Sequence, residues 1–442
     1  MAIRLSDHFT YFRLLRFAMP SIVMLIFTSV YGVVDGFFVS NFVGKTSFAA
    51  VNFVMPFLII LGSVGFVFGT GGGALLAKTL GEGFNERAQR LFSLIVYASA
   101  ACGAVLAACG LLFLRPLAVA LGAQGQLLED CILYGNIVLL AIPAYVLQYE
   151  FQCLFPVAEK PALGLYVTVA AGLTNIVLDA LFIVVFDWGL RGAAWATALS
   201  QLVGGALPLL YFSRANGSLL WLSSAAMELR ALLQACSNGV SELMSNISMS
   251  VVSMLYNWQL LKYAGENGLA AYGVLMYVGI VFQASFIGYS VGTAPIIAYH
   301  YGARRFDELK SLLRKSLTLI SVFAALMFVV AFIFGKSVAI IFVGYDMELL
   351  RLTAQAFSVF AFSFLFSGYV IFASAFFTAL NNGLISAVIS FLRTLVFEAA
   401  AVLTLPLLFG LNGIWFSTVA AEILAVLASV CFLRLKQNYY QY

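Results

Sequence analysis

Residues 91–114 read LFSLIVYASAACGAVLAACGLLFL and contain no charged residue and no proline. A helix needs about 20 predominantly apolar residues to cross the hydrocarbon core of a bilayer, so this stretch is long enough to span a membrane. The rest of the chain has the same character, because 63% of its 442 residues are hydrophobic, 10% are charged and the mean hydropathy is +1.02. Ordinary soluble domains carry about 25% charged residues. The composition therefore excludes a soluble enzyme.

Apolar segments of this length recur along the whole chain. They lie at residues 14–40, 48–77, 91–114, 131–156, 162–186, 192–213, 231–261, 268–300, 312–340, 350–378, 385–408 and 413–433. Lipid accepts only helices or closed barrels, and a barrel would show short alternating segments instead of uninterrupted apolar runs. We predict an all-α polytopic membrane protein with twelve transmembrane helices.

The Lys and Arg residues are divided unevenly between the two sets of loops. With the N-terminus inside, sixteen loop residues of these types fall on the cytoplasmic side and six on the outside. Cytoplasmic loops carry the excess of positive charge, so we predict two cytoplasmic termini and a plasma (inner) membrane location. The first apolar run follows Arg4, Arg13 and Arg16 and is too long for a signal-peptide core. We expect it to stay on the mature protein.

The two halves of the chain resemble each other at an offset of 221 residues. The sequence GLRG at 189–192, followed by Thr197, corresponds to GLNG at 410–413, followed by Thr418. A duplicated unit of six helices inserts both copies with one orientation, so a pseudo-two-fold axis should lie along the membrane normal, as in transporters with a site at the midplane. We name residues 1–213 the N-lobe and 231–442 the C-lobe; residues 214–230 connect them, as a short interfacial helix or as a loop.

Two carboxylates lie inside predicted membrane helices of the N-lobe. Asp35 follows Tyr31 by four residues and Asp179 follows Asn175 by four, so each acid shares a helix face with a polar neighbour. An ionisable residue at the bilayer centre costs about 2.5 to 3.5 kcal/mol on insertion scales. These two acids are therefore the first candidates for a functional site.

Three interpretations of this pair are open. If the two carboxylates meet, burial and like-charge repulsion would favour protonation of one of them, as in a proton carrier. If both stay charged, Asp35, Asp179, the Asn175 amide oxygen and the Thr197 hydroxyl could instead enclose a monovalent cation such as Na⁺. The third possibility is a hydrogen-bonded cluster that only holds helices together.

The C-lobe carries different ionisable residues. Arg393 and Glu398 are five residues apart, which fits one helix face poorly, so an ion pair with another helix is favoured over a transport role. Glu422 suggests a packing contact, and Glu242, among Ser and Asn residues, could join a cation path. Glu242, Arg393 and Glu398 together form a possible second-lobe polar site.

Other residues indicate packing. Pro20 and five further membrane prolines each remove a backbone hydrogen bond and allow a kink; a change in the charge of Asp35 could bend the first helix at Pro20. The glycines of residues 69–73 lack the lysine of a phosphate-binding loop and favour close helix contact. The six cysteines show no metal spacing and behave as small apolar residues. Aromatic residues, 15% of the chain, could add stacking surface for flat cations where they face a cleft.

Several motifs together resemble the multidrug and toxic compound extrusion (MATE) family of cation-coupled antiporters. They are Pro20 with VYGVVDGFFV at 30–39, GTGGGALLAKTLG at 69–81, NIVLDALFI at 175–183, GLRGAAWATALSQ at 189–201, GTAPIIAYHYGA at 292–303 and GLNGIWFSTVAAEILAVL at 410–427. The resemblance covers nearly the whole chain and implies two six-helix lobes around a V-shaped central cavity. It also implies that Tyr31, Asp35, Asn175, Asp179 and Thr197 are the cation-coupling residues and that Pro20 is the bend of the first helix.

The resemblance implies a function with two variants. We expect a non-enzymatic antiporter that exports small organic, mainly cationic, drugs by alternating access in exchange for H⁺, Na⁺ or both. It should act as a monomer in the lipid bilayer, with no cofactor and no nucleic-acid partner. The alternative is a flippase for a lipid-linked precursor. Flippases of this kind often carry basic cavity residues, and here only Arg393 could serve. Some family members place acidic cation ligands on the seventh and tenth helices, but the predicted tenth helix, 350–378, contains no acid. This weakens a second-lobe Na⁺ site and leaves Glu242 without an acidic partner there.

Overall fold

The computed structural model describes the chain except residues 1–2, 215, 226 and 345. Its helices are α1 (Tyr11–Phe38), α2 (Lys45–Phe66), α3 (Gly72–Gly81), α4 (Asn85–Ala120), α5 (Gly125–Leu140), α6 (Ile142–Val157), α7 (Pro161–Asp179), α8 (Gly189–Phe212), α9 (Leu229–Gly302), α10 (Phe306–Val343), α11 (Met347–Phe360), α12 (Phe364–Ala379), α13 (Gly383–Phe391), α14 (Glu398–Phe409) and α15 (Leu411–Tyr440). The described residues form no strand. The all-α prediction is confirmed.

Four π-helical turns and one 3₁₀ turn interrupt or extend these helices. They are η1 (Val39–Val43), η2 (Val67–Gly71), η3 (Ala180–Val185), η4 (Ala361–Ser363) and η5 (Leu392–Phe397). Single π-turns inside α-helices occur frequently at functional sites. Here η1 follows Asp35 by one turn, η3 begins directly after Asp179, and η5 contains Arg393 and ends directly before Glu398.

The described chain contains enough apolar helix for twelve crossings. Ten helical stretches are long and apolar enough to cross a membrane, and α5 and α6, bent by 57° at Ala141, could cross as an eleventh. One of the ten, α9, consists of two helices that meet at Gly265, where φ is 59° and ψ is −148°. Because Gly265 separates the segments predicted at 231–261 and 268–300, α9 accounts for two crossings, and the predicted order of helices is confirmed.

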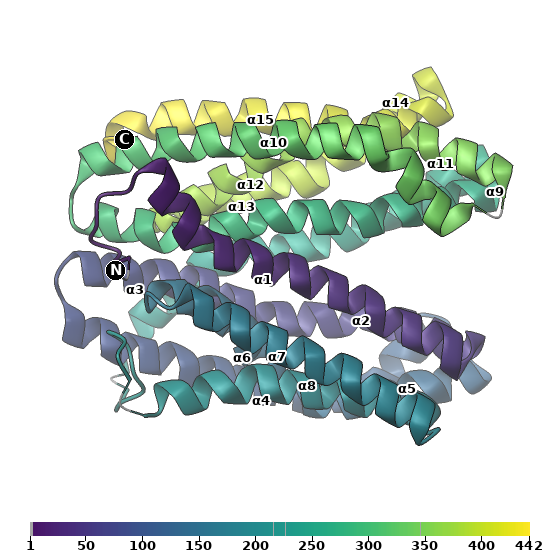
Figure 1. The fold of residues 1–442 in the computed structure, drawn as a ribbon, viewed down its shortest axis with the longest axis horizontal. Coiled ribbons are helices and arrows are strands. Elements are labelled where there is room, and N and C mark those ends of the chain that lie inside the picture. Colours follow the sequence, from purple (N-terminus) through teal and green to yellow (C-terminus); the bar gives the residue numbers. More distant parts are fainter. Residues whose placement is uncertain (1–2, 215, 226, 345) are drawn as a thin grey trace.

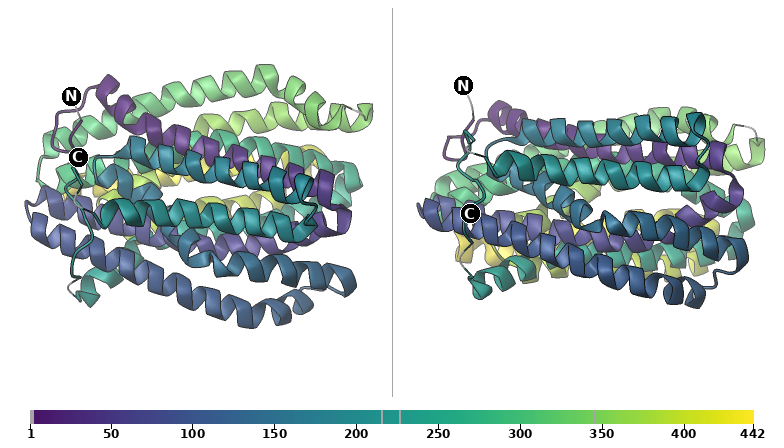
Figure 2. Two further views of the ribbon diagram at one scale, coloured as in Figure 1. Left: turned by 60° about the horizontal axis from the view of Figure 1, so that its bottom comes forward. Right: turned by 90° about the horizontal axis from the view of Figure 1, so that it is seen from below.

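The helices form two elongated bundles, one from each half of the sequence (Figure 1). The long axes of nearly all helices follow one direction, as the turned views also show (Figure 2). Helix α1 lies along the boundary and packs against α9, because Gly288 and Gly292 of α9 leave room for Ile22 and Ala18 of α1. The described residues of the connector between Phe212 and Leu229 contain turns and no helix. The connector is therefore a loop.

Glycines bring the lobes into direct backbone contact at the end where both termini lie (Figure 1). A Cβ atom built on Gly71 would lie 2.6 Å from the Gly239 nitrogen, and one on Gly81 would lie 3.0 Å from the Ala303 nitrogen. Real Cβ atoms almost never approach that closely. The prediction that the Gly69–Gly73 run serves close packing is confirmed: Gly71 meets the opposite lobe, whereas Gly69, Gly72 and Gly73 pack on α6 and α4 of their own lobe.

An N-terminal segment, residues 4–9, binds to both lobes at the same end. The Leu5 N–H donates to Glu159 Oε1 at 2.7 Å in the α6–α7 turn, and His8 Nδ1 lies 2.6 Å from Glu308 Oε2 at the start of α10. The side chain of Phe9 is fully buried and meets His300 edge to face. His300 itself is buried.

Candidate cation-coupling site

Five residues from four helices gather inside the N-lobe. The carboxylate of Asp35 in α1 lies beside the side chains of Asp179 and Asn175 in α7 and Thr197 in α8. The Tyr134 hydroxyl of α5 lies 3.5 Å from Thr197 Oγ1. The structure thus brings together the four residues proposed from the sequence as an ion cage, and adds Tyr134.

The site is closed to solvent. Asp35 retains 6% of its accessible surface, Asp179 none and Asn175 1%. Both Asp179 oxygens, Asp35 Oδ1 and both polar atoms of the Asn175 side chain lack a hydrogen-bond partner among the described residues. Buried polar groups without partners are costly, so this arrangement favours a proton or a small cation between these oxygens.

The two carboxylates have no basic partner in the described chain. Ion pairs are formed by His8–Glu308, Lys78–Glu82, Arg87–Glu228, Arg90–Glu86, Arg115–Glu129 and Arg393–Glu422. None of these includes Asp35 or Asp179. Two buried like charges at one site cannot both remain ionised without compensation, so one carboxyl is protonated or a cation lies between the two.

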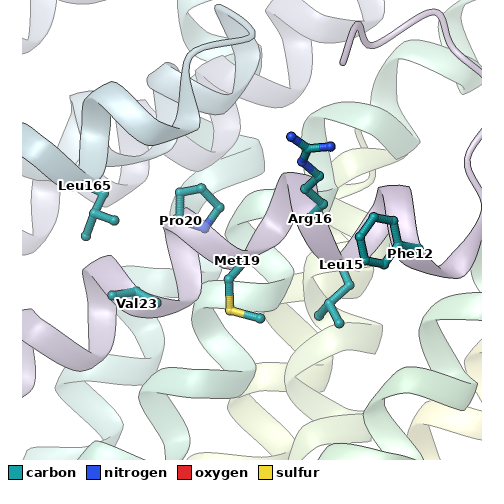
Figure 3. A pocket seen from close by; sticks show the side chains of 7 residues that line it. All are labelled: Phe12, Leu15, Arg16, Met19, Pro20, Val23 and Leu165. Carbon is teal, nitrogen blue, oxygen red and sulfur yellow. The ribbon is translucent and has the colours of Figure 1, made fainter. Parts of the chain in front are cut away.

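Tyr31 lies at the edge of this site. It is close to Asp35 and to the buried amide of Gln148 in α6, as its position one turn before Asp35 suggested. Pro20 lies inside the continuous helix α1, eleven residues before Tyr31, and lines a crevice of 420 Å³ between α1 and α7 with Met19 and Leu165 (Figure 3). Figure 3 shows Arg16 beside this crevice, which is separate from the acidic site.

The C-lobe cluster differs from the set predicted there. Arg393 donates to both oxygens of Glu422 in α15, from Nε at 2.9 and 3.1 Å and from Nη2 at 2.6 Å. Glu398 lies near this pair, but its contacts are with the hydroxyls of Tyr256 and Thr418. The expected ion pair between Arg393 and another helix is confirmed.

Glu242 lies apart from these residues. Its carboxylate faces Cys153 of α6 across the lobe boundary, and no described contact joins it to Arg393 or Glu398. The structure therefore divides the possible second-lobe polar site into two places. Among the described residues no group of three His, Cys, Asp or Glu side chains gathers as at a transition-metal centre.

Sequence reasoning missed one buried acid. Glu150 of α6 has no accessible surface and accepts a hydrogen bond from the Ser99 hydroxyl of α4. It lies within the predicted helix 131–156, in the sequence QYEFQ at 148–152, where three polar residues interrupt an apolar run. That interruption was the available signal.

Comparisons with known proteins agree with this architecture. The MatE family profile matches residues 20–181 and 243–403. The multidrug export protein MepA of Staphylococcus haemolyticus is 24% identical over 92% of this chain and 90% of its own length, and MepA of Staphylococcus aureus is 22% identical over 96% and 94%.

Solved structures show the same fold. One, described as the outward-facing conformation of a multidrug resistance MATE family transporter of the MOP superfamily, superposes with a TM-score of 0.92 at 20% identity over 97% of this chain and 96% of the other. A MOP superfamily transporter from Pyrococcus furiosus, described as having a binding pocket of reverse polarity, superposes with a TM-score of 0.90 at 20% identity over the same shares. The expected architecture of two six-helix lobes is confirmed.

Proposed function

This chain belongs to the MatE family of membrane-embedded multidrug efflux transporters, and we propose that it exports organic cations in exchange for H⁺ or Na⁺ bound in the N-lobe. The observation that carries the coupling proposal is the pair of buried carboxylates, Asp35 and Asp179, without a basic partner in the described chain. A positive charge must occupy this site in at least part of the cycle. Tyr31, Asn175 and Thr197 supply the neighbouring amide and hydroxyl groups.

The contacts between the lobes support alternating access. Close backbone approach occurs at the end that carries the termini, at Gly71–Gly239 and at Gly302–Lys78. This end also carries the basic residues Arg304 and Arg305, which under the positive-inside rule makes it cytoplasmic. We propose that the transporter is a monomer in the plasma (inner) membrane and that this arrangement is closed toward the cytoplasm. A reciprocal opening would release this contact.

Ion binding would bias these two states through α1. Asp35 lies in the same helix as Ala18 and Ile22, which pack on Gly292 and Gly288 of α9. A ligand shifts a conformational equilibrium only by its differential affinity for the two states. We propose that neutralising Asp35 changes the bend of α1 at Pro20 and so alters its packing on the C-lobe.

The flippase alternative is less well supported. It requires a basic residue free to bind a phosphate or pyrophosphate, and the sequence offered only Arg393 for that role. In the structure three hydrogen bonds engage this guanidinium with Glu422. A ligand phosphate would have to displace a buried carboxylate, so we rank this reading second.

Ethidium export tests the proposal. Proteoliposomes should exchange ethidium for H⁺ or Na⁺, and Asp35→Asn or Asp179→Asn should abolish the exchange. The matched control is Asp187→Asn, since Asp187 lies exposed in the α7–α8 turn and should leave exchange unchanged. Full exchange by both site variants would contradict the N-lobe coupling site, and the absence of ethidium transport by the unaltered protein would contradict the substrate class.

A further inference from the structure

Glu398 in the C-lobe is held by two hydroxyl groups. Its Oε1 lies 3.3 Å from the Tyr256 hydroxyl and 3.4 Å from Thr418 Oγ1, while these two hydroxyls lie 2.8 Å from each other. Each hydroxyl has a single hydrogen, and the short contact between them uses one. At most one hydrogen therefore remains for the Glu398 carboxylate, and it acts over a long distance.

The surrounding charges do not compensate this carboxylate. The ionisable groups close to it are Arg393, Glu422, Tyr256 and Tyr272. Arg393 is bound to Glu422 through Nε and Nη2, and the tyrosines are neutral. Two carboxylates share one guanidinium, so the cluster carries one excess negative charge whenever Glu398 is ionised. An uncompensated charge inside the membrane is expensive.

The Glu398 cluster lies at the place in the C-lobe that corresponds, in the sequence repeat, to the cation-coupling site of the N-lobe. Tyr256 is 221 residues after Asp35, and Thr418 is 221 residues after Thr197, so the two residues occupy equivalent positions in the second copy. Each threonine hydroxyl contacts a tyrosine hydroxyl, Tyr134 in the N-lobe and Tyr256 in the C-lobe. Glu398 corresponds to Val177, two residues before Asp179 in the first copy, and it lies directly after the π-turn η5.

Two further buried polar atoms lie on the helix faces that form this cluster. Gln259 Oε1, one turn after Tyr256, and Trp415 Nε1, one turn before Thr418, have no partner in the described chain. Both residues are 97% buried, with 3% of their surface accessible. Atoms of this kind are normally satisfied by ordered water or by a ligand, so these two atoms favour water near the Glu398 cluster.

We propose that Glu398 is a second proton-binding carboxyl of the transport cycle. The carboxylate takes up one proton from water and forms an O–H bond, and it later returns that proton to water; no other bond changes. When Glu398 is ionised, Arg393 has two carboxylates to choose between, Glu422 and Glu398, and protonation leaves Glu422 as its sole partner. The proton on Glu398 thus determines whether the Arg393 side chain binds Glu422 alone or is shared between Glu422 and Glu398.

A second proton has an energetic consequence that rests on the proposed function. Exchange of one monovalent drug cation for one proton moves no net charge, so the membrane potential does not drive it. A second proton makes the exchange electrogenic and adds about 2.3 kcal/mol per 100 mV. The C-lobe site would therefore let the transporter use the potential as well as the pH gradient.

The test is the number of protons exchanged per ethidium in proteoliposomes with a potassium–valinomycin potential. In Glu398→Gln the proton count per ethidium should fall by half, and an imposed potential should no longer accelerate ethidium movement. Glu398→Asp retains a carboxyl and should behave like the unaltered protein, as should Glu348→Gln, whose side chain lies exposed at the start of α11. An unchanged proton count and potential response in Glu398→Gln would overturn the proposal.

A second measurement uses the unaltered protein, in case Glu398→Gln does not fold. Dicyclohexylcarbodiimide adds to protonated carboxyls in apolar surroundings, and mass spectrometry should find it on Glu398, with labelling that falls as the pH rises. The absence of label on Glu398 at every pH would overturn the proposal. Labelling that does not change with pH but is blocked by ethidium would also overturn it, because Glu398 would then be a cation-docking residue. If the unaltered protein moves no ethidium, the proposed function fails, whereas the labelling result still decides the proton site.

Discussion

Gly71 of η2 and Gly239 of α9 lie against each other across the lobe boundary, with no room for a side chain on either. A Cβ atom on Gly71 would come within 2.6 Å of the Gly239 nitrogen, and the backbone of Ala235 lies closer still. Backbone atoms cannot yield as a flexible side-chain end does. The two lobes can therefore close at this end only while neither position carries a side chain.

Gly71→Ala should open the lobes at this contact. Overpacking typically costs about 1 to 3 kcal/mol, which corresponds to a shift of about 5- to 150-fold between the two states. Maleimide labelling of Cys236, with the other cysteines replaced by serine, should rise accordingly. Gly36→Ala is the control, because nothing lies within 4 Å of a Cβ at that position; equal labelling in both variants would contradict the steric account.

Thr197→Val should weaken ion binding in the N-lobe. Loss of one hydrogen-bonding hydroxyl costs about 0.5 to 1.5 kcal/mol, so the H⁺ or Na⁺ concentration that gives half-maximal ethidium export should rise roughly 2- to 12-fold. Thr197→Ser should restore the normal value. Thr174→Val serves as the control, since that hydroxyl bonds only to Ala170 O of its own helix.

Substitutions of Arg393 and Glu422 should change the free energy of unfolding in a non-additive way. Arg393→Gln leaves a buried carboxylate unpaired and should destabilise the protein by about 3 to 5 kcal/mol, and adding Glu422→Gln should recover part of that loss. Thermal unfolding in detergent, ranked across the single and double variants, provides the measurement. Arg115→Gln breaks an exposed pair with Glu129 and should cost about 1 kcal/mol or less.

Phe9→Ala should reveal the contribution of the N-terminal segment. The ring has no accessible surface and meets Phe17 and His300 edge to face, so its loss should destabilise the protein by about 3 to 5 kcal/mol. Phe12→Ala removes a ring that is 73% exposed and should leave the melting temperature nearly unchanged. Similar melting temperatures for the two variants would show that the segment does not hold the lobes.

Glu159 should make stability depend on pH. Burial raises the pKa of this carboxyl, against the opposing effects of the Leu5 N–H and Arg4. The folded state then favours the protonated form, and this stabilisation, complete below the pKa of the unfolded chain, is lost as the pH rises through the raised value. Glu159→Gln should melt like the unaltered protein in acid and at a higher temperature in alkali, whereas exposed Glu86→Gln should show no such trend.

The helices were predictable because the bilayer imposes length and apolarity on every span. The break between α5 and α6 was missed, although Pro143 marks it: proline is favoured in the first turn of a helix, and Pro143 is the second residue of α6. The break at Gly265 matched a polar interruption in the sequence. The π-turns η1, η3 and η5 left no signal, because tertiary contacts decide where a helix widens.

The acidic site of the N-lobe was partly predictable from the spacing of polar residues in the sequence. Spacing of four residues placed Asp35 and Asp179 on polar helix faces, but their meeting depends on how α1 packs on α7. The partner of Arg393 could not be read from the chain, because Glu398 and Glu422 are both in reach only after α14 and α15 fold together. Glu150 was overlooked since its single partner, Ser99, lies on another helix.

The loop between Phe212 and Leu229 allows a larger separation of the two lobes than the transporter needs. Stretched out, residues 213–228 could reach about 50 Å, well beyond any rocking movement of packed bundles. The length of the peptide link therefore does not limit the movement, and contact at the glycine surfaces and the N-terminal segment must keep the halves in register. Two separately encoded polypeptides, divided within this loop, would on that basis be able to reassemble into a working pump.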